Sequence, residues 1–239
     1  MDARLCYLAT PDDPQKPLLL IVCGYRYYEV NYTDLHNHLK DDYTLLVLES
    51  AIELQACRPD KAATAKDMLE EYVRLVRPYL QHRPLAGITG LCIGGDIGLE
   101  LAIRLDEKGL GRPAVFVIDG MADRPAYHGN IGIMEGAGIS RETDAQRKEY
   151  IIAFSKTLHQ HYYPGTAYLF MATQFESVDE YTEDEARHFF PVNRSNWERL
   201  QPGIRISYYN LPHMQLIHDP DTLSQMKHII DDELITQNT

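Results

Sequence analysis

The stretch that decides the fold is Gly90-Leu91-Cys92-Ile93-Gly94-Gly95, which lies between an apolar run and a helical pattern. Residues 86–91 predict a short buried strand, and the spacing of apolar residues over 93–105 predicts a helix. Cys92 therefore lies on a strand-to-helix turn, where the neighbouring glycines let the backbone bend sharply. Such a turn exposes its side chain and directs a helix N-terminus at it, which favours a thiolate and a developing oxyanion. We interpret Cys92 as a nucleophile.

The turn matches the nucleophile elbow of the α/β-hydrolase pattern, G-x-S-x-G, with sulfur in place of oxygen. The alternative interpretation is that Cys92 is a small buried hydrophobic residue in a glycine-rich turn. The other cysteines lack this setting, and we interpret them as structural: Cys6, Cys23 and Cys57.

Composition predicts one ordinary globular domain over residues 1–239. Of the 239 residues 44% are hydrophobic, which is enough for a sizeable core. The formal net charge of -12 argues against nucleic acid or an anionic membrane as the main partner. Four scattered cysteines without a C-x-x-C pair favour neither a disulfide framework nor a metal site. A free reactive thiol, with no recognisable signal peptide or membrane span, predicts a cytoplasmic protein.

Short apolar segments alternate with helical patterns along the chain, which predicts an α/β fold with a mostly parallel, doubly wound sheet. The apolar segments are rich in Leu, Ile and Val without clean alternation, as expected for parallel strands covered on both faces. The expected strands are 5–9, 18–23, 44–48, 87–91, 114–119, 167–172 and 204–209, and the expected helices are 31–40, 62–80, 93–108, 144–161, 194–200 and 222–234.

One long segment interrupts this alternation. Residues 121–166 are more than one crossover helix requires, and we expect them to form an inserted helical lid over a substrate pocket. The alternative is a surface helix pair with no gating role. His128 in this segment and Tyr162 near its aromatic end are candidates for contact with substrate.

The candidate base and acid follow from chain order, because this fold places the nucleophile, the acid and the base in that sequence. His213 comes directly after the last expected strand and is the candidate base, with His218 in reserve. Asp119 ends an apolar run at the carboxyl end of a strand, where catalytic groups gather, and is the candidate acid. An alternative acid lies after the next strand, at Glu176 or Asp179.

A tetrahedral intermediate on this nucleophile needs two hydrogen-bond donors for its oxyanion. The N–H of Ile93, directly after the nucleophile, is the expected first donor. The second is expected from the loop after the strand at 18–23, as the N–H of Tyr25. Gly24 and Tyr27 on the same loop are candidates for contact with substrate.

With these residues in place, the chain resembles the thioesterase domains that end nonribosomal peptide synthetases and polyketide synthases. The resemblance covers nearly the whole chain and rests on the order and spacing of motifs that are weak one by one. They are residues 18–25, residues 32–35, GLCIGGDIGLELA at 90–102, Val117-Ile118-Asp119, Trp197, and Leu211-Pro212-His213-Met214.

The resemblance implies a thioesterase that works through a Cys-His-Asp triad. An acyl or peptidyl chain on the 4'-phosphopantetheine arm of a carrier protein would pass to Cys92. It would then leave by macrocyclisation, as a lactone or lactam, or by hydrolysis, as in antibiotic biosynthesis. The resemblance implies no bound cofactor. The chain differs from most members in carrying Cys92 where they have Ser.

Three alternatives stay open. Stand-alone editing (type II) thioesterases usually place the acid after the later strand, so Asp119 favours a terminal, product-releasing domain. Dienelactone hydrolases share a G-x-C-x-G-G elbow and a similar chain length, but their acid also follows a later strand and they lack the long insertion. A binding module with an inert Cys92 is the non-enzymatic alternative.

Overall fold

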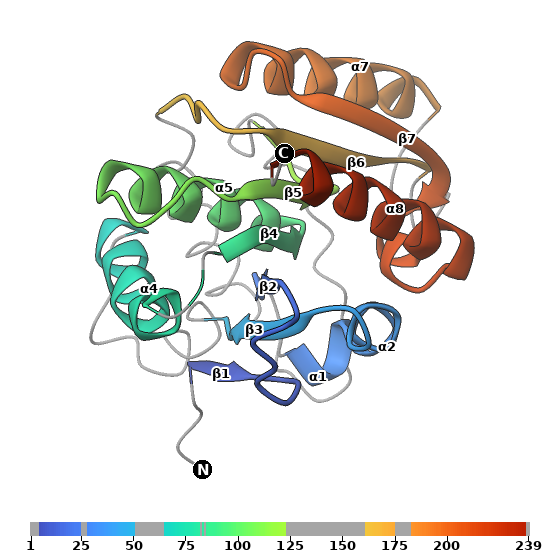
Figure 1. Ribbon diagram of the computed structural model, residues 1–239. Helices are drawn as coiled ribbons and strands as arrows, with labels where there is room; N and C mark the ends of the chain where they lie inside the picture. Colours follow the sequence, from blue (N-terminus) through green and yellow to red (C-terminus); the bar gives the residue numbers. More distant parts are fainter. Residues whose placement is uncertain are drawn as a thin grey trace, which may run out of the picture.

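The computed structural model describes residues 5–24, 28–50, 65–81, 83, 85–122, 161–174 and 183–237. Within these ranges seven strands form one sheet (Figure 1). The strands are β1 (Cys6–Leu8), β2 (Leu18–Val22), β3 (Thr44–Leu48), β4 (Leu85–Leu91), β5 (Ala114–Ile118), β6 (Ala167–Gln174) and β7 (Arg205–Pro212). Each expected strand overlaps one of these.

The sheet is mostly parallel, as the sequence predicts. Its order is β1-β3-β2-β4-β5-β6-β7, and only β1, which runs antiparallel to β3, departs from the parallel arrangement among the described strands. Strands β2, β3 and β5 are buried along their whole length, because helices pack on both faces. This burial explains their continuous runs of Leu, Ile and Val.

Helices cover both faces of the sheet (Figure 1). One face packs against α4 (Ala65–Leu80), α5 (Ile93–Glu107) and α7 (Glu183–Leu200). The other packs against α1 (Tyr28–Asn31), α2 (Thr33–Leu39) and α8 (Pro220–Gln237), with the short 3₁₀ helix η2 (His213–Ile217). The helix expected at 144–161 lies outside the described residues.

Helix α7 is longer than the pattern at 194–200 predicts, because it begins at Glu183. Its first half is charged and aromatic and contains Pro191, so it lacks a clear apolar stripe. Trp197 near its end is fully buried, and the indole Nε1–H donates to the carbonyl oxygen of Gly120 at 3.0 Å. This contact attaches α7 to the residue that follows Asp119.

The end of the expected lid is also different from the prediction. Residues 161–166 form an irregular connection rather than a helix terminus. Tyr163 in this connection is fully buried, and its hydroxyl donates to the carbonyl oxygen of Pro113. Tyr163 therefore anchors residues 161–166 to the core, just before β6 begins. The other residues of the expected lid, 123–160, lie outside the described part of the chain.

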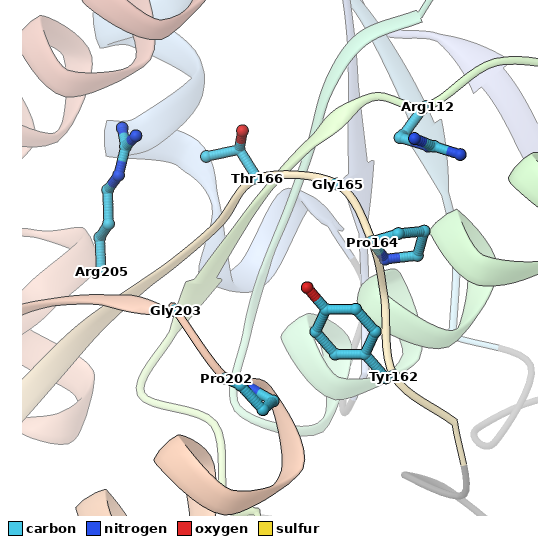
Figure 2. A pocket seen from close by; sticks show the side chains of 8 residues that line it. All are labelled: Arg112, Tyr162, Pro164, Gly165, Thr166, Pro202, Gly203 and Arg205. Carbon is cyan, nitrogen blue, oxygen red and sulfur yellow. The ribbon is translucent and has the colours of Figure 1, made fainter.

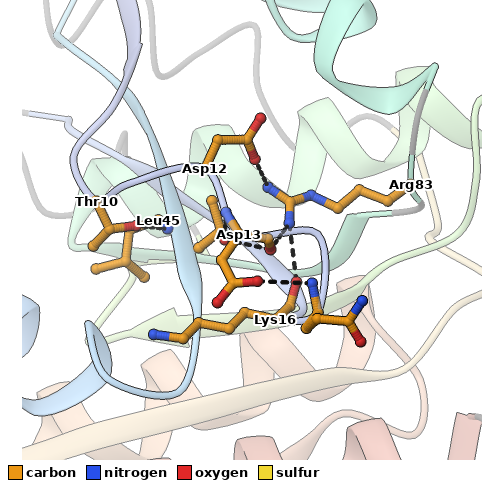
Figure 3. A network of polar contacts seen from close by, with 8 residues as sticks. Thr10, Asp12, Asp13, Lys16, Leu45 and Arg83 are labelled. Atoms are coloured by element: carbon orange, nitrogen blue, oxygen red, sulfur yellow. Dashed lines mark hydrogen bonds and ion pairs between the residues drawn. The ribbon is translucent and has the colours of Figure 1, made fainter.

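Polar contacts at the amino edge of the sheet tie the β1–β2 connection to the strands beside it (Figure 3). Arg83, just before β4, donates to the carbonyl oxygens of Asp13 and Lys16 and pairs with the carboxylate of Asp12. The N–H of Leu45 donates to the hydroxyl of Thr10 at 2.9 Å. These bonds fix the amino ends of β2, β3 and β4, which lie opposite the nucleophile elbow at the carboxyl ends.

The strand order reverses between β2 and β4, because β3 lies on one side of β2 and the later strands lie on the other. In open α/β sheets, ligands bind at the carboxyl ends of the strands at such a reversal. Cys92, directly after β4, lies at this point. No helix among the described residues is long and apolar enough to cross a membrane.

Candidate active site

Cys92 occupies a tight turn between β4 and α5. Its φ of 57° and ψ of -127° are values that a residue with a side chain seldom adopts. The N–H of Cys92 donates to the carbonyl oxygen of Ile118 at 2.7 Å, and its own carbonyl accepts from the N–H of Gly95 at 3.0 Å. These two bonds offset the strain and hold the side chain at the N-terminus of α5. Strained backbone of this kind is concentrated at functional sites.

Glycine is required at the elbow because α5 begins in direct contact with the end of β2. A Cβ atom on Gly94 would lie 2.3 Å from the carbonyl oxygen of Val22. A Cβ atom on Gly24 would lie 2.2 Å from the amide nitrogen of Gly94. Gly24, a predicted substrate contact, is therefore packed against the turn that carries Cys92.

Asp119 is held by three hydrogen bonds just after β5. Its φ of 49° turns the chain away from the strand. Its N–H donates to the carbonyl oxygen of Phe170 at 2.8 Å, and its Oδ1 accepts from the N–H of Ala172 at 2.9 Å. The remaining oxygen, Oδ2, lies 2.7 Å from Nδ1 of His213. The carboxylate thus has one oxygen bound to β6 and the other bound to the imidazole.

His213 is the first residue of η2, and its imidazole lies between Asp119 and Cys92. Because an ionised carboxylate only accepts hydrogen bonds, Nδ1 carries a proton and Nε2 is left for the Cys92 side chain. Burial disfavours the charged ring, but the charge of Cys92 and hydrogen bonds with Asp119 and Cys92 outweigh it. Together they raise the pKa of His213 from 6.5 to about 10. The structure therefore brings together the three residues that chain order predicts.

The N–H of Ile93 is available at the start of α5. The first N–H groups of a helix have no partner within the helix, and they carry the positive end of its dipole. Ile93 is the first residue of α5, next to Cys92, and its side chain is buried. The arrangement suits a developing negative charge beside the sulfur atom.

Several predicted residues lie outside the described part of the chain. They are Tyr25 as the second oxyanion donor, Tyr27 and His128 as substrate contacts, Glu176 and Asp179 as alternative acids, and Cys57 as a structural cysteine.

The reserve base, His218, is placed elsewhere. Its Nδ1 lies 2.6 Å from Oδ2 of Asp34, and both side chains are exposed. The structure therefore gives His218 a different carboxylate from the one that His213 binds.

The structure does not bring Tyr162 to this site. Tyr162 is 54% exposed and lines an open cavity of about 610 Å³ at the amino ends of β5, β6 and β7 (Figure 2). Arg112 and Arg205 lie on opposite sides of this cavity (Figure 2). Cys92, Asp119 and His213 lie at the carboxyl ends of strands, so the length of the sheet separates them from Tyr162. This placement corrects the expectation that Tyr162 contacts substrate.

A buried polar pair at the end of β3 is not among the residues predicted from the sequence. Glu49 and Ser50 are 6% and 0% exposed. The hydroxyl of Ser50 donates to the carbonyl oxygen of Gly24 at 2.7 Å, and Oε2 of Glu49 accepts from the N–H of Tyr28 at 3.0 Å. Two polar residues directly after the apolar run at 44–48 were the signal that could have identified them.

Comparison with known proteins gives structural matches only. No family model matches the chain, and no curated protein matches its sequence. The NocB thioesterase domain from the nocardicin cluster has a TM-score of 0.64 and 19% identity, over 96% of this chain and 98% of that chain. The thioesterase domain SrfTE, described in the cyclisation of the lipopeptide antibiotic surfactin, has a TM-score of 0.57 and 14% identity, over 95% of this chain and 94% of that chain.

An enol-lactonase from Burkholderia xenovorans LB400 is similar to the same extent. Its TM-score is 0.60 at 13% identity, over 97% of this chain and 95% of that chain. Identities this low establish the fold alone. The chain has the α/β-hydrolase fold, and its structure resembles solved thioesterase domains as well as other α/β hydrolases.

Proposed function

We propose that this protein is a thioesterase of natural-product biosynthesis that works through an acyl-enzyme on Cys92. Its substrate would be an acyl or peptidyl thioester on the 4'-phosphopantetheine arm of a carrier protein. The observation that supports this most strongly is the hydrogen-bonded line from Asp119 through His213 to Cys92 at the elbow. Nucleophile, base and orienting carboxylate have the relative positions that covalent acyl transfer needs.

In the first half-reaction, the proton of the Cys92 thiol already lies on Nε2 of His213, and the sulfur of Cys92 attacks the thioester carbonyl carbon as a thiolate. The carbon–sulfur bond to phosphopantetheine then breaks, and His213 returns the proton to the departing thiol. In the second half-reaction, His213 takes a proton from water, or from a hydroxyl or amine of the bound chain. That nucleophile attacks the acyl-enzyme, and the thiol of Cys92 is restored.

Asp119 and the oxyanion donors act in both half-reactions. Asp119 holds the imidazole in the tautomer that leaves Nε2 free, and its charge stabilises the imidazolium. The N–H groups of Ile93 and Tyr25 are the proposed donors to the oxyanion. Removing one such donor costs about 3–4 kcal/mol in enzymes where it has been tested.

A sulfur nucleophile would suit release by ring closure. Transfer from carrier to Cys92 exchanges one thioester for another, so it is close to even in free energy. A serine would store the chain as a less electrophilic oxoester. The thioester on Cys92 therefore retains driving force for lactone or lactam formation, and macrocyclisation is the release that we propose beside hydrolysis. The resemblance to SrfTE, which is described as cyclising surfactin, agrees with this proposal.

The position of the acid favours this function over its alternatives. In dienelactone hydrolases and most editing thioesterases the base would be oriented by a carboxylate after the later strand. Here Nδ1 of His213 is bound to Asp119, after β5. We expect the protein to act in the cytoplasm, where reducing conditions keep Cys92 as a thiol.

The test is the intact mass of the protein after it is mixed with acyl thioesters of N-acetylcysteamine and with an acyl-loaded carrier protein. The wild type should gain one acyl group, and Cys92→Ala should gain none. Cys6→Ala is the matched control, because Cys6 is a partly buried cysteine away from the elbow, and it should be acylated like the wild type. Analysis of the released product then separates ring closure from hydrolysis.

Two results would contradict the proposal. One is a wild type that is neither acylated nor turned over with several chains of different length. The other is an adduct that persists in Cys92→Ala. Either would favour a lactone hydrolase or a binding module.

A further inference from the structure

We propose that Asn193 is a positioning residue for acyl transfer, because its side-chain amide holds the turn after Asp119 and so keeps the carboxylate on His213. The inference rests on the proposed function, since it concerns the base that serves Cys92. Neither the elbow pattern nor the line from Asp119 to Cys92 includes Asn193.

Asn193 binds two backbone groups of this turn with the two ends of its amide. Its Nδ2 donates to the carbonyl oxygen of Gly120 at 3.2 Å, and its Oδ1 accepts from the N–H of Ala122 at 3.2 Å. Because a carbonyl accepts and an N–H donates, these partners fix the orientation of the amide. Asn193 is 1% exposed, so removing its amide would deprive the N–H of Ala122 of this partner where water does not replace it.

Trp197 binds the same carbonyl group from the next turn of α7. Its Nε1–H donates to the carbonyl oxygen of Gly120 at 3.0 Å. Residues four positions apart on a helix share a face, so Asn193 and Trp197 reach the turn together. A carbonyl oxygen has two lone pairs, which suffice for these two donors. The direction of the Gly120 carbonyl is therefore set from α7.

Asp119 needs this support because its backbone is strained. Its φ of 49° lies in the left-handed region, which a residue with a side chain seldom adopts. Such a conformation persists where the surrounding structure holds the chain in place. On the strand side the N–H of Asp119 is bound to Phe170, and on the other side the turn is bound to α7. The direction of the Asp119 side chain depends on both anchors.

The turn also packs directly against α7. A Cβ atom on Gly120 would lie 3.0 Å from Cζ2 of Trp197, and 2.3 Å from Oδ1 of Asp96 on the opposite side, in α5. The position of the turn therefore follows that of α7. The Oδ2 atom of Asp119, 2.7 Å from Nδ1 of His213, follows the turn.

Gln201 offers a matched control, because it makes the same kind of contact at the amino end of the sheet. It follows α7 directly and is 2% exposed. Its Oε1 accepts from the N–H of Tyr163 at 3.0 Å, and its Nε2 donates to the carbonyl oxygen of Tyr163 at 2.6 Å. Of these two buried amides, Asn193 alone binds the segment that follows Asp119.

The experiment compares Asn193→Leu with Gln201→Met, because each substitution removes an amide and keeps a side chain of similar size. Trp197→Phe is a second variant at the turn, since it removes one donor to Gly120 and leaves Asn193 in place. Thermal melting confirms that each variant is folded. If Asn193→Leu unfolds, Trp197→Phe carries the measurements that follow.

The first measurement is the maximal rate at which a p-nitrophenyl ester acylates Cys92. We expect Asn193→Leu to lower this rate about 10- to 100-fold with little change in KM, because a catalytic group misplaced by about 1 Å costs roughly 10²-fold. Trp197→Phe should lose less, since Asn193 still binds the carbonyl. Gln201→Met should stay within about twofold of the wild type.

The same substitution in an Asp119→Asn background tests whether Asn193 acts through the carboxylate. Asp119→Asn has already lost the charge that orients the imidazole. We therefore expect Asn193→Leu to change the acylation rate of Asp119→Asn by no more than about twofold. Equal losses in both backgrounds would overturn the inference, because they would indicate general damage to the structure.

The second measurement is the titration of the His213 ring, followed by NMR. The hydrogen bond and the charge of Asp119 help to raise the pKa of His213, so a displaced carboxylate lowers it. The ring should lose its proton at lower pH in Asn193→Leu than in the wild type, and at the wild-type pH in Gln201→Met. An unchanged titration in both Asn193→Leu and Trp197→Phe would overturn the inference.

The two measurements separate this inference from the proposed function. A wild type acylated by the ester but by no N-acetylcysteamine thioester would contradict the thioesterase, and the ester would still test Asn193. A wild type whose Cys92 accepts neither acyl group would contradict the acyl-enzyme. The titration, which needs no substrate, would then decide whether Asn193 keeps Asp119 on His213.

Discussion

Asp119 and His213 lie 94 positions apart in the chain, and a hydrogen bond of 2.7 Å joins Oδ2 of one to Nδ1 of the other. Both partners are anchored independently. Asp119 also binds the N–H of Ala172 in β6, and His213 begins η2 directly after β7. The imidazole is therefore oriented before any substrate arrives, which is the property that a general base needs.

Replacing the carboxylate tests this orientation. In Asp119→Asn the amide cannot stabilise the imidazolium, and its N–H₂ group favours the wrong tautomer of His213. We expect kcat for thioester turnover to fall by roughly 10²–10⁴, with KM nearly unchanged. Asp34→Asn is the matched control, because it alters the exposed pair with His218. It should keep the wild-type kcat, and a similar loss in both variants would show that the effect is not specific to the site.

The pKa of His213 depends on Cys92. In the wild type the Cys92 charge and hydrogen bond, together with Asp119, hold the pKa of His213 at about 10 against the opposing effect of burial. In Cys92→Ala two of the raising effects are lost and burial remains, so the pKa must fall. NMR titration of the His213 ring should show deprotonation at lower pH in the variant. Equal titration midpoints in the two proteins would contradict the direct contact.

Two glycines one helical turn apart in α5 should respond differently to alanine. Gly94→Ala places a Cβ atom 2.3 Å from the backbone oxygen of Val22, which cannot move without displacing β2. Gly98→Ala instead places a Cβ atom near two side-chain methyl groups, Cγ2 of Ile88 at 3.0 Å and Cγ2 of Val22 at 3.9 Å. We expect Gly94→Ala to lower the free energy of unfolding by about 1–3 kcal/mol and to reduce acylation of Cys92.

Gly98→Ala should change that free energy by no more than about 1 kcal/mol, since better helix propensity offsets the tighter packing. Denaturant unfolding measures both values. Equal stabilities of the two variants would show that β2 and α5 can separate freely.

Tyr32 links the strands on either side of the reversal in strand order. Its buried hydroxyl accepts from the N–H of Leu91 at 2.9 Å and donates to the carbonyl oxygen of Val22 at 3.3 Å. Tyr32→Phe leaves both groups without this partner, and we expect it to lower the free energy of unfolding by about 1–3 kcal/mol. The measurement is again denaturant unfolding.

Tyr28→Phe is the control for this variant, because the ring of Tyr28 stacks on Tyr32 while its hydroxyl binds the partly exposed His36. It should cost about 1 kcal/mol or less. A larger loss for Tyr28→Phe than for Tyr32→Phe would contradict the role that we assign to the buried hydroxyl.

Apolar runs in the sequence are sufficient to predict most strands of the sheet. The apolar runs that become β2, β3, β4 and β5 were predicted within two residues, because strands buried on both faces need continuous apolar sequence. The predicted helix at 194–200 is shorter than α7, since the sequence of the first half of α7 has no apolar stripe. The glycines around Cys92 indicated the elbow, because only a residue without a side chain fits where α5 touches the end of β2.

Other features depend on which strands are neighbours, and no local period contains that information. The order β5-β6-β7 brings Asp119, Ala172 and His213 to one edge of the sheet. The same topology sends Tyr162 to the opposite edge, although it follows Asp119 in the chain. It also places Ser50 on Gly24, because β3 lies beside β2. Periodicity is a property of neighbouring residues, whereas contacts between strand ends arise only when the whole sheet has assembled.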